Sequence, residues 1–288
     1  MQVSEDSNQN VSNISKNRMP SAASTPVLVT AMLGFSLWGV GWLLLVVDRM
    51  SHLGWGLEVA GPLLVAFAII GFTEHLVRRI GKPAVAFAAV GALVGAISTL
   101  PYAISPSNLS SVSGLRFGYC AYGIGLLCGF VALSLVSVVL GKQLLAADKL
   151  CPAGCECGER IHASIGSTSL AAVGFLIWGL GFLDLYALPN GSSYGWILAT
   201  VGTAMVTLAL ANHVLHLTGR FGALAAWIGI GSAAIWSVGY LLQAINPTAG
   251  FQSSWYSDLF GCYGAGHLLS ALSVALVLAH KANVSRGN

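Results

Sequence analysis

The sequence predicts an all-α polytopic membrane protein that crosses the bilayer eight times, as two parallel four-helix repeats (4+4). Three observations lead to this fold class. The 288 residues are 56% hydrophobic and only 8% charged, eight apolar runs are long enough to span a bilayer, and one sequence pattern recurs after about 140 residues. An average soluble domain is about 25% charged. Backbone in lipid must satisfy its own hydrogen bonds, so helices are expected where the alternation of a β-barrel is absent.

The eight apolar runs are each close to the length of about 20 residues that a helix needs to cross the hydrocarbon. They lie at 26–47, 57–77, 83–104, 117–141, 165–187, 196–217, 221–245 and 259–279. The connections between them are too short to hold a soluble domain. The first run begins late and is long, so we expect a retained membrane anchor and not a cleaved signal peptide.

The runs divide the chain into five parts. Residues 1–25 are polar and rich in Ser and Asn, which predicts a disordered cytoplasmic tail. The first repeat occupies 26–141, and a cytoplasmic linker that contains cysteines follows at 142–164. The second repeat occupies 165–280 and leads to a cytoplasmic tail at 281–288.

The predicted duplication rests on matches in all four pairs of helices. The segment Gly34–Trp42 (GFSLWGVGW) returns as Gly174–Phe182 (GFLIWGLGF). Further matches, in the same order, are Gly54-Trp55 with Gly195-Trp196, Glu74–Lys82 with Asn212–Arg220, Tyr102 with Tyr240, and Tyr122–Gly125 with Tyr263–Gly266. The offset stays between 138 and 141 residues, which is typical of an internal repeat. Each half has an even number of spans, so the halves are expected to be parallel, related by an axis along the membrane normal.

The glycines of the first match are expected to be packing residues. Lipid gives no hydrophobic drive for helix pairing, and small residues let helix backbones approach closely instead. The alternative is that these glycines also admit a ligand or a flat cofactor. The residues concerned are Gly34, Gly39, Gly41, Gly174, Gly179 and Gly181.

Four tryptophans of the matched segments fall at two depths. Trp55 and Trp196 lie at predicted membrane boundaries, where an aromatic belt is expected. Trp38 and Trp178 lie deeper within their runs and are expected to be core residues.

The basic residues predict the orientation. Eleven of the thirteen Lys and Arg residues fall in the tails and in every second connection, and only Arg49 and Arg116 fall on the other side. Because Lys and Arg mark cytoplasmic segments, both termini are expected in the cytoplasm. The protein is expected in a plasma membrane of the bacterial inner-membrane type. The same bias explains the net charge of +3, and there is no basic patch for a nucleic acid.

Two histidines, His75 and His213, are matched near the cytoplasmic ends of the second and sixth runs. The simplest interpretation is that they are interfacial residues near the headgroups. Alternatively they bind a haem b iron between the repeats, or border a proton or substrate path. Glu74 and Arg78 are four residues apart and can pair on a helix, which favours a structural role.

Other ionisable residues fall within the runs. His267 lies near the middle of the last run, where a polar group is costly, so we expect a functional role or a hydrogen bond between helices. Glu58 and Asp184 lie near predicted outer ends. They are interpreted as solvated carboxylates, with the alternative that they line an outer vestibule with Tyr102 and Tyr240.

The linker carries Cys151, Cys155 and Cys157, followed by His162. Three thiolates and an imidazole suit a tetrahedral zinc site. The spacing is not that of paired C-x-x-C knuckles, so unused reduced thiols are the simpler interpretation.

The sequence contains no Walker A, H-E-x-x-H, G-x-S-x-G or dinucleotide-binding pattern, which disfavours an enzyme. The leading hypothesis is a transporter-like protein that handles a small molecule, lipid or ion between its two repeats. One alternative is a membrane redox protein that carries haem b on His75 and His213 and exchanges electrons with a quinone. Another is a non-catalytic subunit or assembly factor of a membrane complex. The expected partners are the lipid bilayer and a second membrane protein or another copy of the chain.

Overall fold

The computed structural model describes residues 25–72, 77, 80–150, 156–188, 193–247 and 254–286, with side chains except at 146–150, 156–163, 216 and 285–286. Within these ranges the chain is helical, without strands, and eight helical segments are long and apolar enough to cross a membrane. The prediction of an all-α multi-pass protein is therefore confirmed. The predicted N-terminal tail lies almost entirely outside the described residues.

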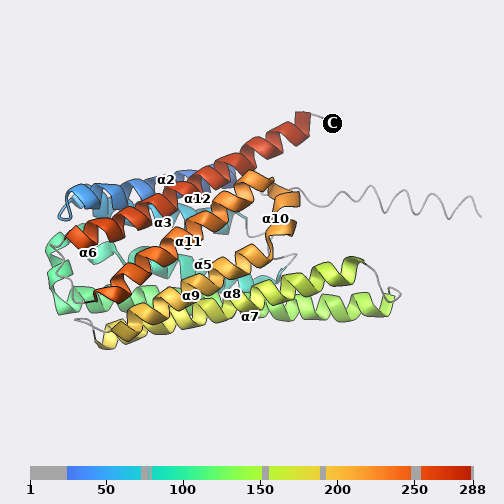
Figure 1. Cartoon of the computed structure of the whole chain (residues 1–288), viewed down its shortest axis with the longest axis horizontal. Coiled ribbons are helices and arrows are strands. Elements are labelled where there is room, and N and C mark those ends of the chain that lie inside the picture. The colour runs from blue at the N-terminus through green and yellow to red at the C-terminus, as the bar shows by residue number, and fades with distance from the viewer. Residues whose placement is uncertain are drawn as a thin grey trace, which may run out of the picture.

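The spanning helices lie roughly along one common axis (Figure 1). They are α2 (Thr25–Val47), α3 (His52–Gly71), α5 (Lys82–Ile97) with its continuation α6 (Leu100–Ile104), α7 (Val112–Leu150), α8 (Glu156–Ala187), α9 (Ser193–Asn212), α11 (Ala223–Ile245) and α12 (Ser254–Arg286). Two short helices lie in connections: the 3-10 helix η1 (Pro106–Ser110) and α10 (Val214–Phe221).

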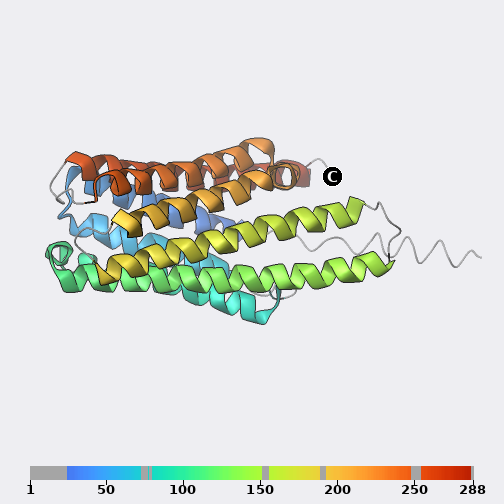
Figure 2. The same cartoon turned by 60° about the horizontal axis from the view of Figure 1, so that its bottom comes forward.

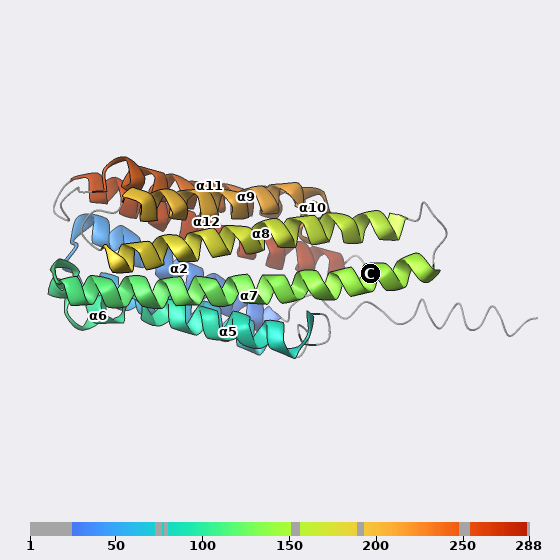
Figure 3. The ribbon, with the colours of Figure 1, turned by 90° about the horizontal axis from the view of Figure 1, so that it is seen from below.

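The eight segments form a closed ring. Going round it, α2 packs against α3, α3 against α5, α5 against α7, α7 against α8, α8 against α9, α9 against α11, α11 against α12, and α12 against α2. Figures 2 and 3 show that α7 and α8 extend beyond the other helices at the end where α12 finishes. With 39 residues, α7 is about 58 Å long, nearly twice the hydrocarbon thickness of about 30 Å. Of the region predicted as a linker, 142–164, the described parts 142–150 and 156–164 are helical.

Glycines hold the seam between α2 and α3 together. A Cβ added at Gly61 would lie 2.6 Å from the Cβ of Trp38 and 2.8 Å from the carbonyl oxygen of Gly34. A Cβ at Gly41 would lie 3.0 Å from the carbonyl oxygen of Gly54. Contacts this short are possible only without side chains, so the two backbones touch directly.

The same kind of contact recurs elsewhere in the ring. Between α8 and α9, a Cβ at Gly202 would lie 2.6 Å from the Cβ of Trp178. Between α2 and α12, a Cβ at Gly39 would lie 3.0 Å from the Gly264 carbonyl oxygen; between α8 and α7, one at Gly179 would lie 3.2 Å from that of Gly123. All six glycines expected to pack, Gly34, Gly39, Gly41, Gly174, Gly179 and Gly181, face a neighbouring helix in this way, which confirms their packing role.

Two tight turns precede α5 and α11. Gly81 and Gly222 adopt φ angles of 87° and 91°, a left-handed conformation that residues with a Cβ rarely adopt. Each of these glycines directly precedes the first residue of the next helix.

The α2–α3 seam gives a direct test of glycine packing. Gly61→Ala is expected to lower the free energy of unfolding by about 1–3 kcal/mol, because the new methyl group overpacks against Trp38. Gly56→Ala, in the same helix, is the matched control because an added Cβ there meets no atom within 4 Å. Thermal unfolding midpoints in detergent measure both variants. Equal midpoints for Gly61→Ala and the wild type would show that the seam tolerates a side chain.

Candidate ligand-binding cavity

The ring of helices encloses a cavity of about 600 Å³. All eight spanning segments contribute side chains or backbone to its wall. The cavity extends from Trp38 and Pro62, near the middle of α2 and α3, to Leu109 and Pro247 in connections at the end opposite the C-terminus. Its size falls within the range of about 300–1,000 Å³ that is usual for small-molecule sites.

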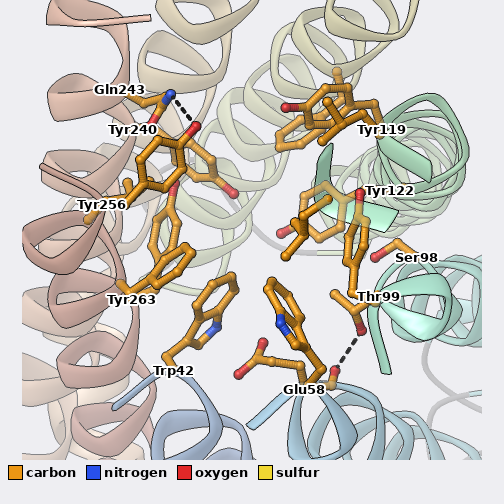
Figure 4. Close-up of a pocket in the computed structure, with 18 of the residues that line it drawn as sticks. Trp42, Glu58, Ser98, Thr99, Tyr119, Tyr122, Tyr240, Gln243, Tyr256 and Tyr263 are labelled. Atoms are coloured by element: carbon orange, nitrogen blue, oxygen red, sulfur yellow. Dashed lines mark hydrogen bonds between the residues drawn. The ribbon is translucent and has the colours of Figure 1, made fainter. Parts of the chain in front are cut away.

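Aromatic side chains make up most of the wall (Figure 4). They pack on one another through tilted and edge-to-face contacts, which hold the rings in fixed orientations. Trp42 lies 5.1 Å from Tyr263 and 6.0 Å from Trp55, measured between ring centroids. The aromatic lining residues are Trp38, Trp42, Trp55, Tyr102, Tyr119, Tyr122, Phe182, Trp196, Trp236, Tyr240, Tyr256, Phe260 and Tyr263.

Glu58 places a carboxyl group in this aromatic wall. Its side chain is 0% exposed, so the interpretation of Glu58 as a solvated carboxylate is wrong. Trp38 Nε1 donates a hydrogen bond of 2.8 Å to Oε2, whereas Oε1 is buried with no hydrogen-bond partner. Figure 4 shows the carboxyl group in the lower part of the view, turned toward Trp42.

The local sequence explains how Glu58 is held. Pro62 lacks an N–H, so the Glu58 carbonyl oxygen loses its helical donor four residues along α3. Thr99 Oγ1, at the break between α5 and α6, donates to that oxygen instead, over 3.0 Å. Gly41 leaves room for the carboxyl group, because a Cβ at that position would lie 2.7 Å from Oε1.

Two more buried polar atoms at the cavity have no partner. Gln243 is 1% exposed; its Nε2 donates to the Tyr256 hydroxyl over 3.3 Å, but its Oε1 accepts nothing. The Nε1 of Trp42 donates to nothing. Since buried polar groups are almost always hydrogen-bonded, unpartnered atoms of Glu58, Gln243 and Trp42 around one cavity indicate places for polar groups of a ligand or for ordered water.

His267 lies beside the cavity and does not line it. Its ring stacks on Trp38 at 3.8 Å between centroids and meets Trp236 edge-on at 4.6 Å. It is buried, and its Nε2 has no hydrogen-bond partner. Through Trp38, His267 is in continuous contact with Glu58.

Some of the other residues predicted from the sequence line the cavity, and others do not. Tyr102 and Tyr240 line the cavity, whereas Asp184 on α8 does not. Trp55 and Trp196 are 2% and 9% exposed and line the cavity as well, so their placement in an interfacial belt is wrong. The rings form an internal wall because both helices begin before the predicted boundaries.

Five lining residues were not predicted as site residues from the sequence: Trp42, Tyr119, Tyr256, Tyr263 and Gln243. A usable signal was present, since Tyr256 and Tyr263 are seven residues apart and therefore share one face of a helix. Aromatic residues at such spacing on several helices, all in the halves away from the termini, indicate an inward aromatic wall.

Most of the predicted haem and zinc ligands lie outside the residues that the structure describes in full. His75 and Glu74 lie outside the described residues, and His213 lies at the junction of α9 and α10. Cys151 and Cys155 are also outside, and Cys157 and His162 lie on α8 where only the backbone is described. In the described part of the chain, no group of three or more His, Cys, Asp or Glu residues is placed to hold a metal ion. Both sites stay predictions.

Comparisons of this chain with models of known protein families, with curated proteins and with solved structures find no match.

The hydrogen bond from Trp38 to Glu58 can be tested by its effect on stability. Trp38→Phe is expected to lower the free energy of unfolding by about 1–3 kcal/mol beyond the loss from ring truncation, because it leaves a second carboxyl oxygen without a donor. Trp178→Phe is the control, since the Trp178 Nε1 is buried without a partner. Glu58→Gln, which keeps an acceptor for Trp38, is expected to unfold at or above the wild-type temperature. A large loss of stability in Glu58→Gln would contradict the conclusion that the Glu58 carboxyl group lacks a second hydrogen-bond donor.

Proposed function

We propose that this multi-pass membrane protein is a transporter-like protein that binds a small molecule in the central cavity and passes it between the two sides of the bilayer. The observation that carries the proposal is the aromatic cavity, which reaches the middle of the membrane helices and contains buried polar atoms without partners. Such sites near the bilayer midplane are typical of transporters with repeated halves.

The proposal includes the 4+4 duplication, and the glycine contacts support it. A Cβ at Gly34 meets the Gly61 carbonyl oxygen and Val65, and one at Gly174 meets the Gly202 carbonyl oxygen and Val206. These residues are 140 or 141 positions apart in the sequence. The left-handed glycines at 81 and 222 are 141 apart as well.

The two junctions between the proposed halves are also alike. Gly39 on α2 contacts Gly264 and Leu268 on α12, and Gly179 on α8 contacts Gly123 and Leu127 on α7. Two equivalent junctions on opposite sides of a ring are what a pseudo-twofold axis along the membrane normal produces. The cavity then lies on that axis, where rocking of one half against the other would change access to it.

The contacts favour one alignment, or register, of α5 in the first half with α11 in the second half. Gly91 would meet the Gly125 carbonyl oxygen through an added Cβ, and Ser232 Oγ donates to the Gly266 carbonyl oxygen over 2.8 Å. This register has an offset of 141 and matches Tyr102 with Gln243, not with Tyr240 as expected from the sequence. The two halves would then contribute different polar groups at equivalent places in the cavity wall.

We also propose that both termini are cytoplasmic in a plasma membrane, from the distribution of Lys and Arg. The cavity then lies in the outer half of the membrane, below the connections that contain η1 and Pro247. The redox hypothesis depends on His75, outside the described residues. The subunit or assembly-factor hypothesis requires a partner and does not account for the cavity, so the small-molecule function has the stronger support.

Filling the cavity is expected to abolish binding. An added Cβ at Gly95, which lines the cavity, meets no atom within 4 Å, so Gly95→Leu should fold and occupy part of the space. Gly231→Leu is the control, since Gly231 has the same free space and does not line the cavity. Mass spectrometry of small molecules extracted from the protein in lipid nanodiscs should detect a bound compound in the wild type and in Gly231→Leu only. Equal recovery from Gly95→Leu would contradict binding in the cavity.

The orientation has an independent test. Green fluorescent protein fused after residue 288 should fluoresce in a bacterial host, and alkaline phosphatase fused at the same point should be inactive, because the first folds in the cytoplasm and the second outside it. Active phosphatase would reverse the proposed orientation and place the cavity in the cytoplasmic half.

A further inference from the structure

The cavity wall contains an acidic group without a basic partner. Among the described residues that line the cavity, Glu58 is the one carboxylic acid, and none is Lys or Arg. Arg49 and Arg116 are not among the lining residues. Arg49 donates to Ser257 Oγ over 2.9 Å, and Arg116 lies 6.0 Å from the centre of the Tyr186 ring. Burying a carboxylate without a counter-charge is costly, so a cation bound in the cavity would be stabilised there.

The other groups of the wall favour the same charge. The faces of Trp and Tyr rings attract cations, and the attraction is strongest where water is excluded. Trp42 contacts both Trp55 and Tyr263, and all three rings line the cavity together with Glu58. A bound anion would face both these rings and Glu58, so the wall selects against it.

The unpartnered acceptors specify the kind of cation. Oε1 of Glu58 and Oε1 of Gln243 are both buried acceptors without a donor. An inorganic cation would leave most of a 600 Å³ aromatic cavity unfilled. An ammonium group with N–H donors fits the carboxyl oxygen, and an attached apolar body fits the rings. Figure 4 shows Gln243 and Glu58 on opposite sides of the cavity, so a second donor at the far end of the molecule would reach Gln243.

The carboxyl group belongs to one half of the ring only. At the offset of 141 given by Gly54-Trp55 and Gly195-Trp196, the position of Glu58 corresponds to Ala199, which is 0% exposed and lies against Gly181. A cavity with two similar halves and one acid has a single strongest place for a charged group. A ligand would therefore bind in one orientation.

We propose that the cavity binds an organic cation: a protonated amine whose ammonium group pairs with Glu58 and whose apolar part packs against the aromatic wall. This inference rests on the proposed function, since it names the class of molecule that the cavity takes.

The test compares two molecules of similar shape and different charge, 2-phenylethylammonium and 2-phenylethanol. Isothermal titration calorimetry at pH 7 uses the full chain in lipid nanodiscs, with empty nanodiscs as the blank; an alkyl amine is protonated at this pH, as lysine is. The amine is expected to bind at least tenfold more tightly than the alcohol. Glu58→Gln should abolish this preference, whereas Asp258→Asn, which removes an exposed acid of α12 outside the cavity wall, should retain it.

The aromatic wall is tested in the same titration. Tyr263→Leu should weaken binding of the amine by about three- to thirtyfold and leave the alcohol nearly unaffected, because cation–π attraction is lost. Absence of amine binding to the wild type, equal affinity for the alcohol, or an unchanged preference in Glu58→Gln would each overturn the organic-cation proposal. The proposed function fails separately, if Gly95→Leu retains the compound that the wild type retains.

Discussion

Direct contact between helix backbones at glycine closes the ring, and the cavity depends on that closure. At the seam of α2 and α3, the Gly61 position leaves no room even for a methyl group against Trp38. Lipid tails surround these helices with a medium as apolar as their own side chains, so close packing and hydrogen bonds must supply the association. Glycines occupy the seams between the helices, and large aromatic side chains of α2 and α3, such as Trp42 and Trp55, point into the cavity.

The polar residues of the cavity are arranged at a cost to stability. Glu58 has one donor for two carboxyl oxygens, and the backbone beside it is interrupted at Pro62, so that Thr99 must replace a helical hydrogen bond. Gln243 leaves its amide oxygen unpartnered on the other side. Departures from local rules of this kind gather at functional sites, where a ligand completes the missing interactions.

The sequence predicted the eight spans and their order because apolar length and composition are local properties of each helix. The predicted positions of Glu58 and Trp55 were wrong because the second apolar run begins at residue 57, whereas α3 begins at His52. Five residues more of helix move both side chains from a membrane boundary into the interior. Which face of each helix turns inward depends on ring closure by distant helices, as in the contact of α2 with α12. No single run of sequence carries that information, so most of the aromatic wall was not identified beforehand.

The proposed organic-cation site can be observed directly in the folded protein. An electron cryomicroscopy map of the full chain in lipid nanodiscs with saturating 2-phenylethylammonium should show the ring open at its centre. Density that belongs to no residue should lie among the aromatic rings, with one end against the Glu58 carboxyl group. A map in which Trp42 and Tyr263 collapse into the space, or in which a lipid acyl chain fills it without contact to Glu58, would contradict the account.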